Sequence, residues 1–151
     1  MSRTAISTNR LAAEGAAVRP GVDDAPAVID HIGFEVADLE RSARFYDAVF
    51  FPLGVRRVHS NGVAIAYGAD GATFWITSRG RPAPAYGHVA LRAAGKVAVD
   101  AAHAAGLANG GGDAGGPGPR PQYGSRCYAG YLRDPDGLRV ELVSGGRADS
   151  G

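Results

Sequence analysis

The chain carries the same succession of elements twice, and this internal repeat restricts its fold more than any other feature. Each copy opens with a strand-like segment in which a histidine occupies the same point, His31 in the first copy and His88 in the second. A helical pattern and then further strands follow in both copies. We therefore expect an α+β fold of two tandem βαβββ modules. They would form a curved mixed sheet with helices on its outer side and a cavity on its concave side.

The first copy has clear signals at the start of its helix and at its turns. Asp38 is a good N-cap residue. The helix that follows has an apolar stripe made of Leu39, Ala43, Tyr46 and Phe50. Gly54 ends this unit, and three strands are expected at 55–60, 63–68 and 72–78. They are separated by Asn61-Gly62 and Asp70-Gly71, dipeptides that favour hairpin turns.

The second copy ends in a well-defined turn. Its helix is expected at 96–105, closed by Gly106. Residues 109–125 are too rich in glycine and proline for regular structure, so we expect either a plain connector or a lid over the concave face. The segment 134–137, Asp-Pro-Asp-Gly, predicts a tight turn between two strands, because proline fixes φ at its first central position.

Length and composition indicate a single domain without a nucleic-acid or membrane partner. Of 151 residues, we assign 27–145 to the domain, with modules at 28–80 and 86–145 and disordered tails at 1–26 and 146–151. The net charge is +1 and there is no basic run. The single cysteine, Cys127, cannot form an internal disulfide and is expected to be a small buried residue. A reducing, cytoplasmic location follows.

Three side chains share the face of the strands that would line the cavity. Strand alternation gives His31 and His88 the same face in their two modules, and Glu141 belongs to that face of the closing strand. Glutamate is rarely buried without a partner. Two histidines and one carboxylate with open positions form a pattern used for divalent metal chemistry. The alternative is that each of the three is a structural residue of the core or the sheet edge.

The same segments resemble the vicinal oxygen chelate superfamily over about residues 27–145. This superfamily comprises glyoxalase I, fosfomycin-modifying enzymes, methylmalonyl-CoA epimerases, extradiol dioxygenases and bleomycin-resistance binding proteins. The matching motifs are DHIGFEVADLERSARFY (30–46), GHVAL (87–91) and DPDGLRVELV (134–143). The resemblance implies that His31, His88 and Glu141 bind one divalent ion, namely Fe²⁺, Mn²⁺, Ni²⁺, Co²⁺ or Zn²⁺. It also implies a homodimer, since these folds complete their sites by pairing modules within or between chains.

One position departs from the glyoxalase I and epimerase pattern. These enzymes take a fourth ligand from the closing strand of the first module, where this chain has Trp75. An indole does not bind a metal in this way, so the three-ligand set of the extradiol and fosfomycin branches remains. Trp75 is either an aromatic floor for a planar or apolar substrate or a packing residue.

Several other residues are candidates for roles beside this site. Glu35 lies on the His31 face and is either a general base or a charge at the rim. The second module offers phenol and guanidinium groups for an anionic or enolate-like substrate, at Tyr123, Arg126, Tyr128 and Tyr131. Strand alternation allows only one of Tyr128 and Tyr131 to point inward, and the sequence leaves both open. Glu35 and Tyr131 are the candidate catalytic residues. We also expect one of Arg56 and Arg57 to face the cavity, His59 to lie in phase with Arg57, and His103 to be on the surface.

These observations favour a metalloenzyme that acts on a small oxygen-bearing molecule chelated by the ion. The resemblance implies lyase or isomerase chemistry, or ring-cleaving dioxygenation. A fosfomycin-type thiol transferase is one alternative. A metal-free protein that binds a drug or metabolite, as bleomycin-resistance proteins do, is another. Those resistance proteins generally lack the ligand triad, so the presence of His31, His88 and Glu141 argues for the enzyme.

Overall fold

The computed structural model describes residues 29–145, so the tails expected at 1–26 and 146–151 lie outside the described residues. Module one consists of β1 (Ile32–Glu35), α1 (Leu39–Phe50), the 3₁₀ helix η2 (Phe51–Leu53), β2 (Arg56–Ser60), β3 (Ala64–Gly68) and β4 (Phe74–Thr77). Module two consists of β5 (His88–Arg92), α2 (Lys96–Ala108), β6 (Gly112–Pro119), the 3₁₀ helix η3 (Pro121–Tyr123), β7 (Tyr128–Arg133) and β8 (Arg139–Ser144). The expected βαβββ repeat is confirmed.

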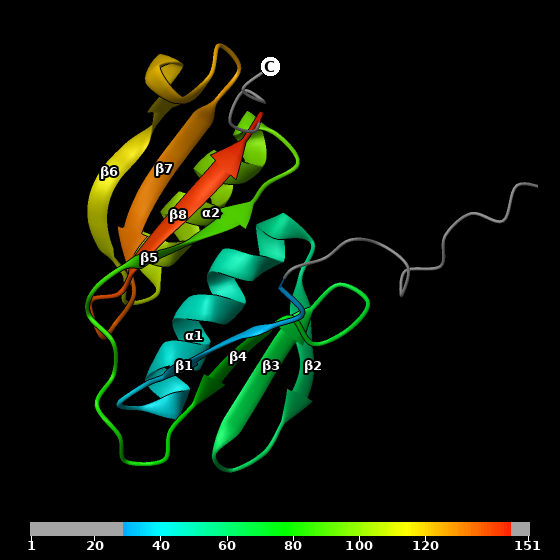
Figure 1. Cartoon of the computed structure of the whole chain (residues 1–151), viewed down its shortest axis with the longest axis vertical. Coiled ribbons are helices and arrows are strands. Elements are labelled where there is room, and N and C mark those ends of the chain that lie inside the picture. The colour runs from blue at the N-terminus through cyan, green and yellow to red at the C-terminus, as the bar shows by residue number, and fades with distance from the viewer. Residues whose placement is uncertain (1–28, 146–151) are drawn as a thin grey trace, which may run out of the picture.

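The strands form two four-stranded mixed sheets of identical topology. Their orders are β1-β4-β3-β2 and β5-β8-β7-β6. In each sheet the opening strand pairs in parallel with the closing strand, and the remaining pairs are antiparallel. Figure 1 shows the two sheets at opposite ends of the molecule, with α1 and α2 in contact where the modules meet. Within the described residues, β1 and β5 are each one of the two edge strands of their sheet.

The first helix begins as its sequence predicts. The side chain of Asp38 accepts a hydrogen bond of 2.9 Å from the backbone N–H of Arg41, which satisfies one of the free donors of the first turn. The buried face of α1 then supplies a large aromatic cluster to the core. Its rings are Phe45, Tyr46 and Phe50 from α1 with Tyr67 and Phe74 from the sheet.

Burial of alternate strand residues divides each sheet into two faces. Val140 and Leu142 of β8 belong to the core against the helices, together with Leu132 of β7. Arg139 and Glu141 therefore lie on the opposite face. We call this side of each sheet, which points away from α1 and α2, the open face.

The turn at 134–137 also joins the two modules. The hydroxyl of Tyr46 donates a hydrogen bond of 2.7 Å to Asp134, and both residues are buried. Arg41 forms an ion pair of 2.7 Å with Asp136. Two aspartates of module two are thus held by α1 of module one.

The expectation of an irregular segment at 109–125 is wrong. Residues Gly112–Pro119 form β6, which pairs antiparallel with β7 and has register shifts between Asp113 and Gly115 and between Gly115 and Gly118. Proline lacks the N–H needed in a central strand, but it is tolerated in an edge strand such as this one. The segment is therefore built into the sheet, which removes the basis for a lid.

Two expectations about α2 are also wrong. The helix continues to Ala108, so Gly106 lies inside it, where a Cβ atom would come within 2.5 Å of Leu132 and 3.0 Å of Val49. This glycine permits close packing rather than ending the helix. His103 is buried, and its Nε2 lies 3.1 Å from the carbonyl oxygen of Tyr131 and 3.3 Å from Asp113.

Cys127 is buried, as expected. None of the helices formed by residues 29–145 is long and apolar enough to cross a membrane.

Candidate metal and substrate site

The open face of module two brings together a histidine, a carboxylate and a phenol. His88 lies on β5, Glu141 on β8 and Tyr131 on β7. Glu141 has two register partners: Ala90 of β5 across the parallel pair and Tyr131 of β7 across the antiparallel pair. His88 is two residues before Ala90, so its side chain returns to the same face as Glu141.

His88 and Glu141 form the closest approach between predicted metal ligands. Their Nε2 and Oε2 atoms are 3.7 Å apart, and the side chains are 48% and 4% exposed, respectively. A carboxylate so well buried requires a partner. On this face the partner is the half-exposed imidazole of His88.

The pair fits a single metal ion. Nitrogen and oxygen ligands bind zinc at about 2.1 Å, so two of them can be up to about 4.2 Å apart. The 3.7 Å between His88 and Glu141 lies within this span. Both donor types are suited to first-row divalent ions.

His31 is not part of this pair in a single chain. Among residues 29–145, no group of three His, Cys, Asp or Glu side chains comes close enough to hold one ion. His31 is exposed just before β1, and its Nδ1 lies 2.6 Å from Oδ2 of Asp30. In the tautomer that donates from Nδ1, Nε2 is free. A carboxylate that fixes the far nitrogen in this way is a common companion of metal-binding histidines.

Trp75 occupies the position in module one that Glu141 occupies in module two. Gly33 is its register partner, just as Ala90 is the partner of Glu141. Its half-buried ring lies on the open face, 5.5 Å from the ring of His59. This position therefore offers an aromatic surface and no metal ligand.

The prediction that Arg57 and His59 share a face of β2 is wrong, because a bulge lies between them. Arg57 pairs with Tyr67 whereas His59 pairs with Ala66, which leaves Val58 as the extra residue. Arg57 consequently turns to the helix side and forms an ion pair of 2.6 Å with Asp47. His59 lies on the open face beside Trp75, and Asn61 is 3.1 Å from its Nε2.

Glu35 is hydrogen-bonded to the segment that follows β4. Its carboxylate accepts hydrogen bonds from the hydroxyl of Thr77 and from the backbone N–H groups of Arg79 and Arg81. The Arg79 bond is the main reason that the pKa of Glu35 lies below its ordinary value of 4.5. Its two oxygens are thus occupied with holding residues 79–81 in place.

The four module-two residues predicted to act on the substrate do not come together: the two strand tyrosines lie on opposite faces, and the other two residues lie in a connection. Tyr128 points to the helix side, where its hydroxyl donates a hydrogen bond of 2.7 Å to Asp100 of α2. Tyr131 is the tyrosine that faces the open side, beside Glu141. Tyr123 and Arg126 are exposed in the connection between β6 and β7.

Two arginines that were not among the predicted site residues flank Tyr131. The guanidinium carbon of Arg139 lies 4.2 Å from the centre of the Tyr131 ring, and that of Arg120 lies 5.6 Å from it. Burial raises the pKa of Tyr131, and the negative charge of Glu141 adds to this effect. The phenol therefore keeps its proton at neutral pH. Strand alternation from Glu141 indicates the face of Arg139, whereas no sequence signal indicates Arg120.

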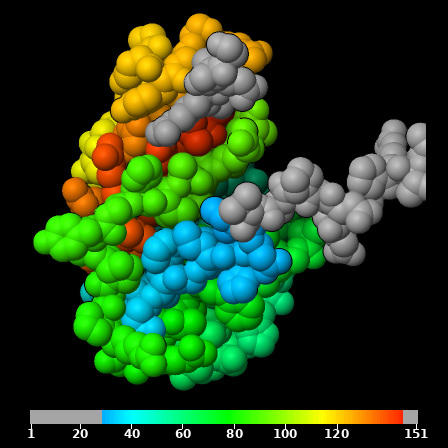
Figure 2. Space-filling view, viewed as in Figure 1, coloured from blue at the N-terminus to red at the C-terminus, as the bar shows by residue number. Residues whose placement is uncertain are grey.

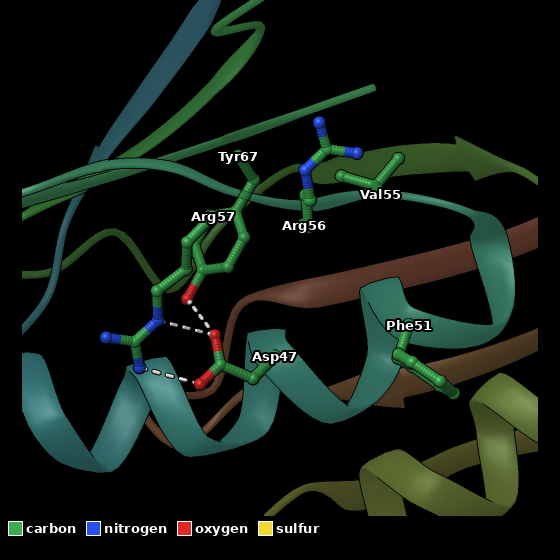
Figure 3. Close-up of a pocket in the computed structure, with 6 residues that line it drawn as sticks. All are labelled: Asp47, Phe51, Val55, Arg56, Arg57 and Tyr67. Carbon is green, nitrogen blue, oxygen red and sulfur yellow. Dashed lines mark hydrogen bonds and ion pairs between the residues drawn. The ribbon is translucent and has the colours of Figure 1, made fainter. Parts of the chain in front are cut away.

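A separate hollow lies on the helix side of module one (Figure 3). Its volume is about 290 Å³, and it is lined by Asp47, Phe51, Val55, Arg56, Arg57 and Tyr67. Asp47 is already bound by Arg57 and by the hydroxyl of Tyr67, while Arg56 points away from it. The hollow is on the opposite side of the sheet from Trp75, and the described contacts give it no link to His88 and Glu141.

Comparisons with known proteins agree with the fold. The profile of the Glyoxalase/Bleomycin resistance protein/Dioxygenase superfamily matches residues 28–142. A glyoxalase/bleomycin resistance protein from Albidiferax ferrireducens T118 is 35% identical, with a TM-score of 0.71 over 78% of this chain and 98% of that chain. A glyoxalase-related enzyme from Fulvimarina pelagi shares the fold, with 24% identity and a TM-score of 0.62 over 79% of this chain and 88% of that chain.

A glyoxalase I mutant from Zea mays is 27% identical, with a TM-score of 0.57. The match covers 76% of this chain but 44% of the maize chain. No curated protein matches the sequence. The match covers most of the chain, from the start of module one to Leu142 in β8, and includes Glu141. This chain therefore belongs to the Glyoxalase/Bleomycin resistance protein/Dioxygenase superfamily.

Proposed function

We propose that this protein is a metal-dependent enzyme of the superfamily that acts on a small oxygen-bearing substrate. The observation that carries the proposal is the pair formed by His88 and the buried Glu141, 3.7 Å apart on the open face of module two. A divalent ion bound there would supply Lewis-acid polarisation of substrate oxygen atoms. The expected reaction is of the lyase or isomerase type, or a ring-cleaving dioxygenation.

The third ligand, His31, comes from a second copy of the chain in this proposal. Within residues 29–145 of one chain, His31 stands apart from His88 and Glu141. It precedes the edge strand β1, and His88 begins the edge strand β5. Figure 2 shows the first described residues, in blue, at the surface of the molecule. Large apolar side chains are exposed next to both edges, at Ile29 and Tyr86, which suits burial in an interface.

The remaining residues of the site have defined tasks. Asp30 orients His31 through the 2.6 Å contact with Nδ1 and leaves Nε2 for the ion. Tyr131 keeps its proton beside Glu141 and is placed to donate a hydrogen bond to a substrate oxygen. Trp75, from the module that contributes His31, provides an apolar surface against which a substrate can pack.

A mixing experiment tests the two-copy site directly. Chains carrying His31→Ala and chains carrying Glu141→Ala are each expected to lose tight binding of Co²⁺. After subunit exchange, half of the dimers contain both chains, and one of their two sites has all three ligands. Metal binding should therefore return to about one quarter of the sites.

A mixture of His88→Ala and Glu141→Ala chains is the matched control. Both changes lie in module two, so no combination of these chains restores a complete site. Equal metal binding by the two mixtures would contradict the shared site. Absence of tight metal binding by the unaltered protein would contradict the enzyme itself.

The second candidate is a metal-free protein that binds an aromatic drug or metabolite. The half-buried ring of Trp75 on the open face, in contact with His59, favours it. In that case the unaltered protein would bind aromatic ligands in the presence of a chelator. Substitution of Trp75 would weaken this binding, whereas substitution of Glu141 by glutamine would leave it unchanged.

A further inference from the structure

We propose that the substrate carries an anionic group, most simply a carboxylate, and that Arg139 and Arg120 bind it beside Tyr131. The inference rests on the proposed function in that it places this substrate at the same open face. It concerns a different set of side chains from the metal ligands. Its test therefore requires no metal.

Arg139 lies next to both module-two ligands. It is the register partner of His88 across the parallel pair of β5 and β8, and it precedes Glu141 by two residues on the same face. Its guanidinium carbon is 4.2 Å from the centre of the Tyr131 ring, and Tyr131 is in turn the partner of Glu141. A substrate bound at His88 and Glu141 would thus have Arg139 as an immediate neighbour.

Arg120 approaches the same ring from the connection between β6 and β7. Its guanidinium carbon is 5.6 Å from the ring centre, and that of Arg139 is 4.2 Å from it. Both guanidinium groups are therefore close to the same phenol. Two backbone carbonyl oxygens hold it, those of Gly116 at 2.9 Å and Pro119 at 3.4 Å. These contacts favour a position of the Arg120 guanidinium near the Tyr131 ring.

Neither Arg120 nor Arg139 forms an ion pair with an acidic side chain among the described residues. Between residues 29 and 145, the arginines in ion pairs are Arg41 with Asp136 and Arg57 with Asp47. The ion-pair contact of Glu141 is with His88 instead. Two positive charges consequently remain beside a phenol that is only 8% exposed. Such an arrangement favours an incoming anion.

The position of the Arg139 guanidinium over the Tyr131 ring also suits carboxylate recognition. A guanidinium placed over an aromatic ring uses its flat face for that contact and keeps its N–H groups at the edge. These groups match the two oxygens of a carboxylate, and such charge-assisted hydrogen bonds are among the strongest in proteins. The ring would thus hold Arg139 in a defined orientation. A neutral analogue of the substrate would gain little affinity from Arg139.

Binding of benzoate and of its neutral analogue benzamide to the chelator-treated full chain tests the inference. Backbone amide NMR shifts report the affinity of each. We expect benzoate to bind at least about tenfold more tightly, since one charge-assisted hydrogen bond is worth that factor. Arg139→Gln should bring the two affinities within about twofold, and Arg139→Lys should keep part of the preference.

The matched control is Arg44→Gln, which removes the same charge from an exposed position on α1 and should leave the preference unchanged. The inference is overturned if the unaltered protein binds both probes equally. It is also overturned if an Arg120→Gln, Arg139→Gln double variant with an otherwise native spectrum keeps the preference. A benzoate preference in a protein that binds no metal would leave this inference standing and remove the enzyme proposal. Metal binding without the preference would do the reverse.

Discussion

The hydroxyl of Tyr46 donates a 2.7 Å hydrogen bond to the buried carboxylate of Asp134, which follows it by 88 residues in the chain. This bond connects α1 of module one to the turn between β7 and β8 of module two. The other oxygen of Asp134 accepts the backbone N–H groups of Asp136 and Leu138. One side chain thus shapes the turn and fastens it to the neighbouring module, while β8 leads from this turn to Glu141.

Replacing Tyr46 by phenylalanine should destabilise the protein by about 1.5 to 3 kcal/mol, the range for a hydrogen bond to a charged group. The aromatic packing with Phe45, Phe50 and Phe74 would be kept. Denaturant unfolding measures the change in the free energy of unfolding. Tyr128→Phe is the matched control, because it removes another 2.7 Å bond to an aspartate, but an exposed one. It should change the free energy of unfolding by no more than about 0.5 kcal/mol. Equal changes for both variants would contradict a special role of the Tyr46–Asp134 bond between the modules.

Glu35 should titrate below its ordinary pKa of 4.5, because its carboxylate accepts hydrogen bonds from the backbone of Arg79 and Arg81 and from Thr77. A lowered pKa means that the folded state binds protons less readily than the unfolded state. The stabilisation is therefore present above pH 4.5 and is lost as pH falls through the folded pKa. NMR titration of the Glu35 carboxyl carbon measures this. A midpoint at or above 4.5 would contradict the described contacts.

Gly68 should not tolerate a side chain. A Cβ atom there would lie 1.5 Å from the backbone oxygen of Gly71, so the turn between β3 and β4 would have to move. Gly68→Ala is expected to cost at least about 2 kcal/mol in the free energy of unfolding. Gly62→Ala, in the preceding turn, has nothing within 4 Å of the new atom and should be close to neutral. Similar midpoints of thermal unfolding for the two variants would argue against this geometry.

Local periodicity was sufficient to predict the modules and the faces of most strands. Alternation predicted that Glu141 and Trp75 lie on the face away from the core. The reason is that their apolar neighbours in the chain are buried: Val140 and Leu142 flank Glu141, and Phe74 and Ile76 flank Trp75. The same reasoning failed at β2, where the bulge at Val58 shifts the phase by one residue. A bulge of this kind leaves no mark in the pattern of apolar residues.

Other features depend on contacts between distant segments, which a sequence pattern does not contain. The glycine-rich and proline-rich β6 is a strand because β7 provides a partner. His103 can be buried because its Nε2 is close to two acceptors, the backbone oxygen of Tyr131 and the carboxylate of Asp113. His31 is predicted to join His88 and Glu141, yet the position of module one relative to module two decides whether it does so within one chain. Within one chain, that relation depends on the packing of α1 against α2.

The most direct test of the account is the affinity of the protein for Co²⁺, followed by absorption spectroscopy and calorimetry. We expect about one ion per chain, and we expect Glu141→Gln to weaken binding about 100-fold or more, since even the loss of a residue behind a ligand costs 10- to 100-fold. Glu40→Gln, which alters an exposed glutamate of α1, should have no effect. Equal affinities of the unaltered protein and Glu141→Gln would contradict a metal site at His88 and Glu141.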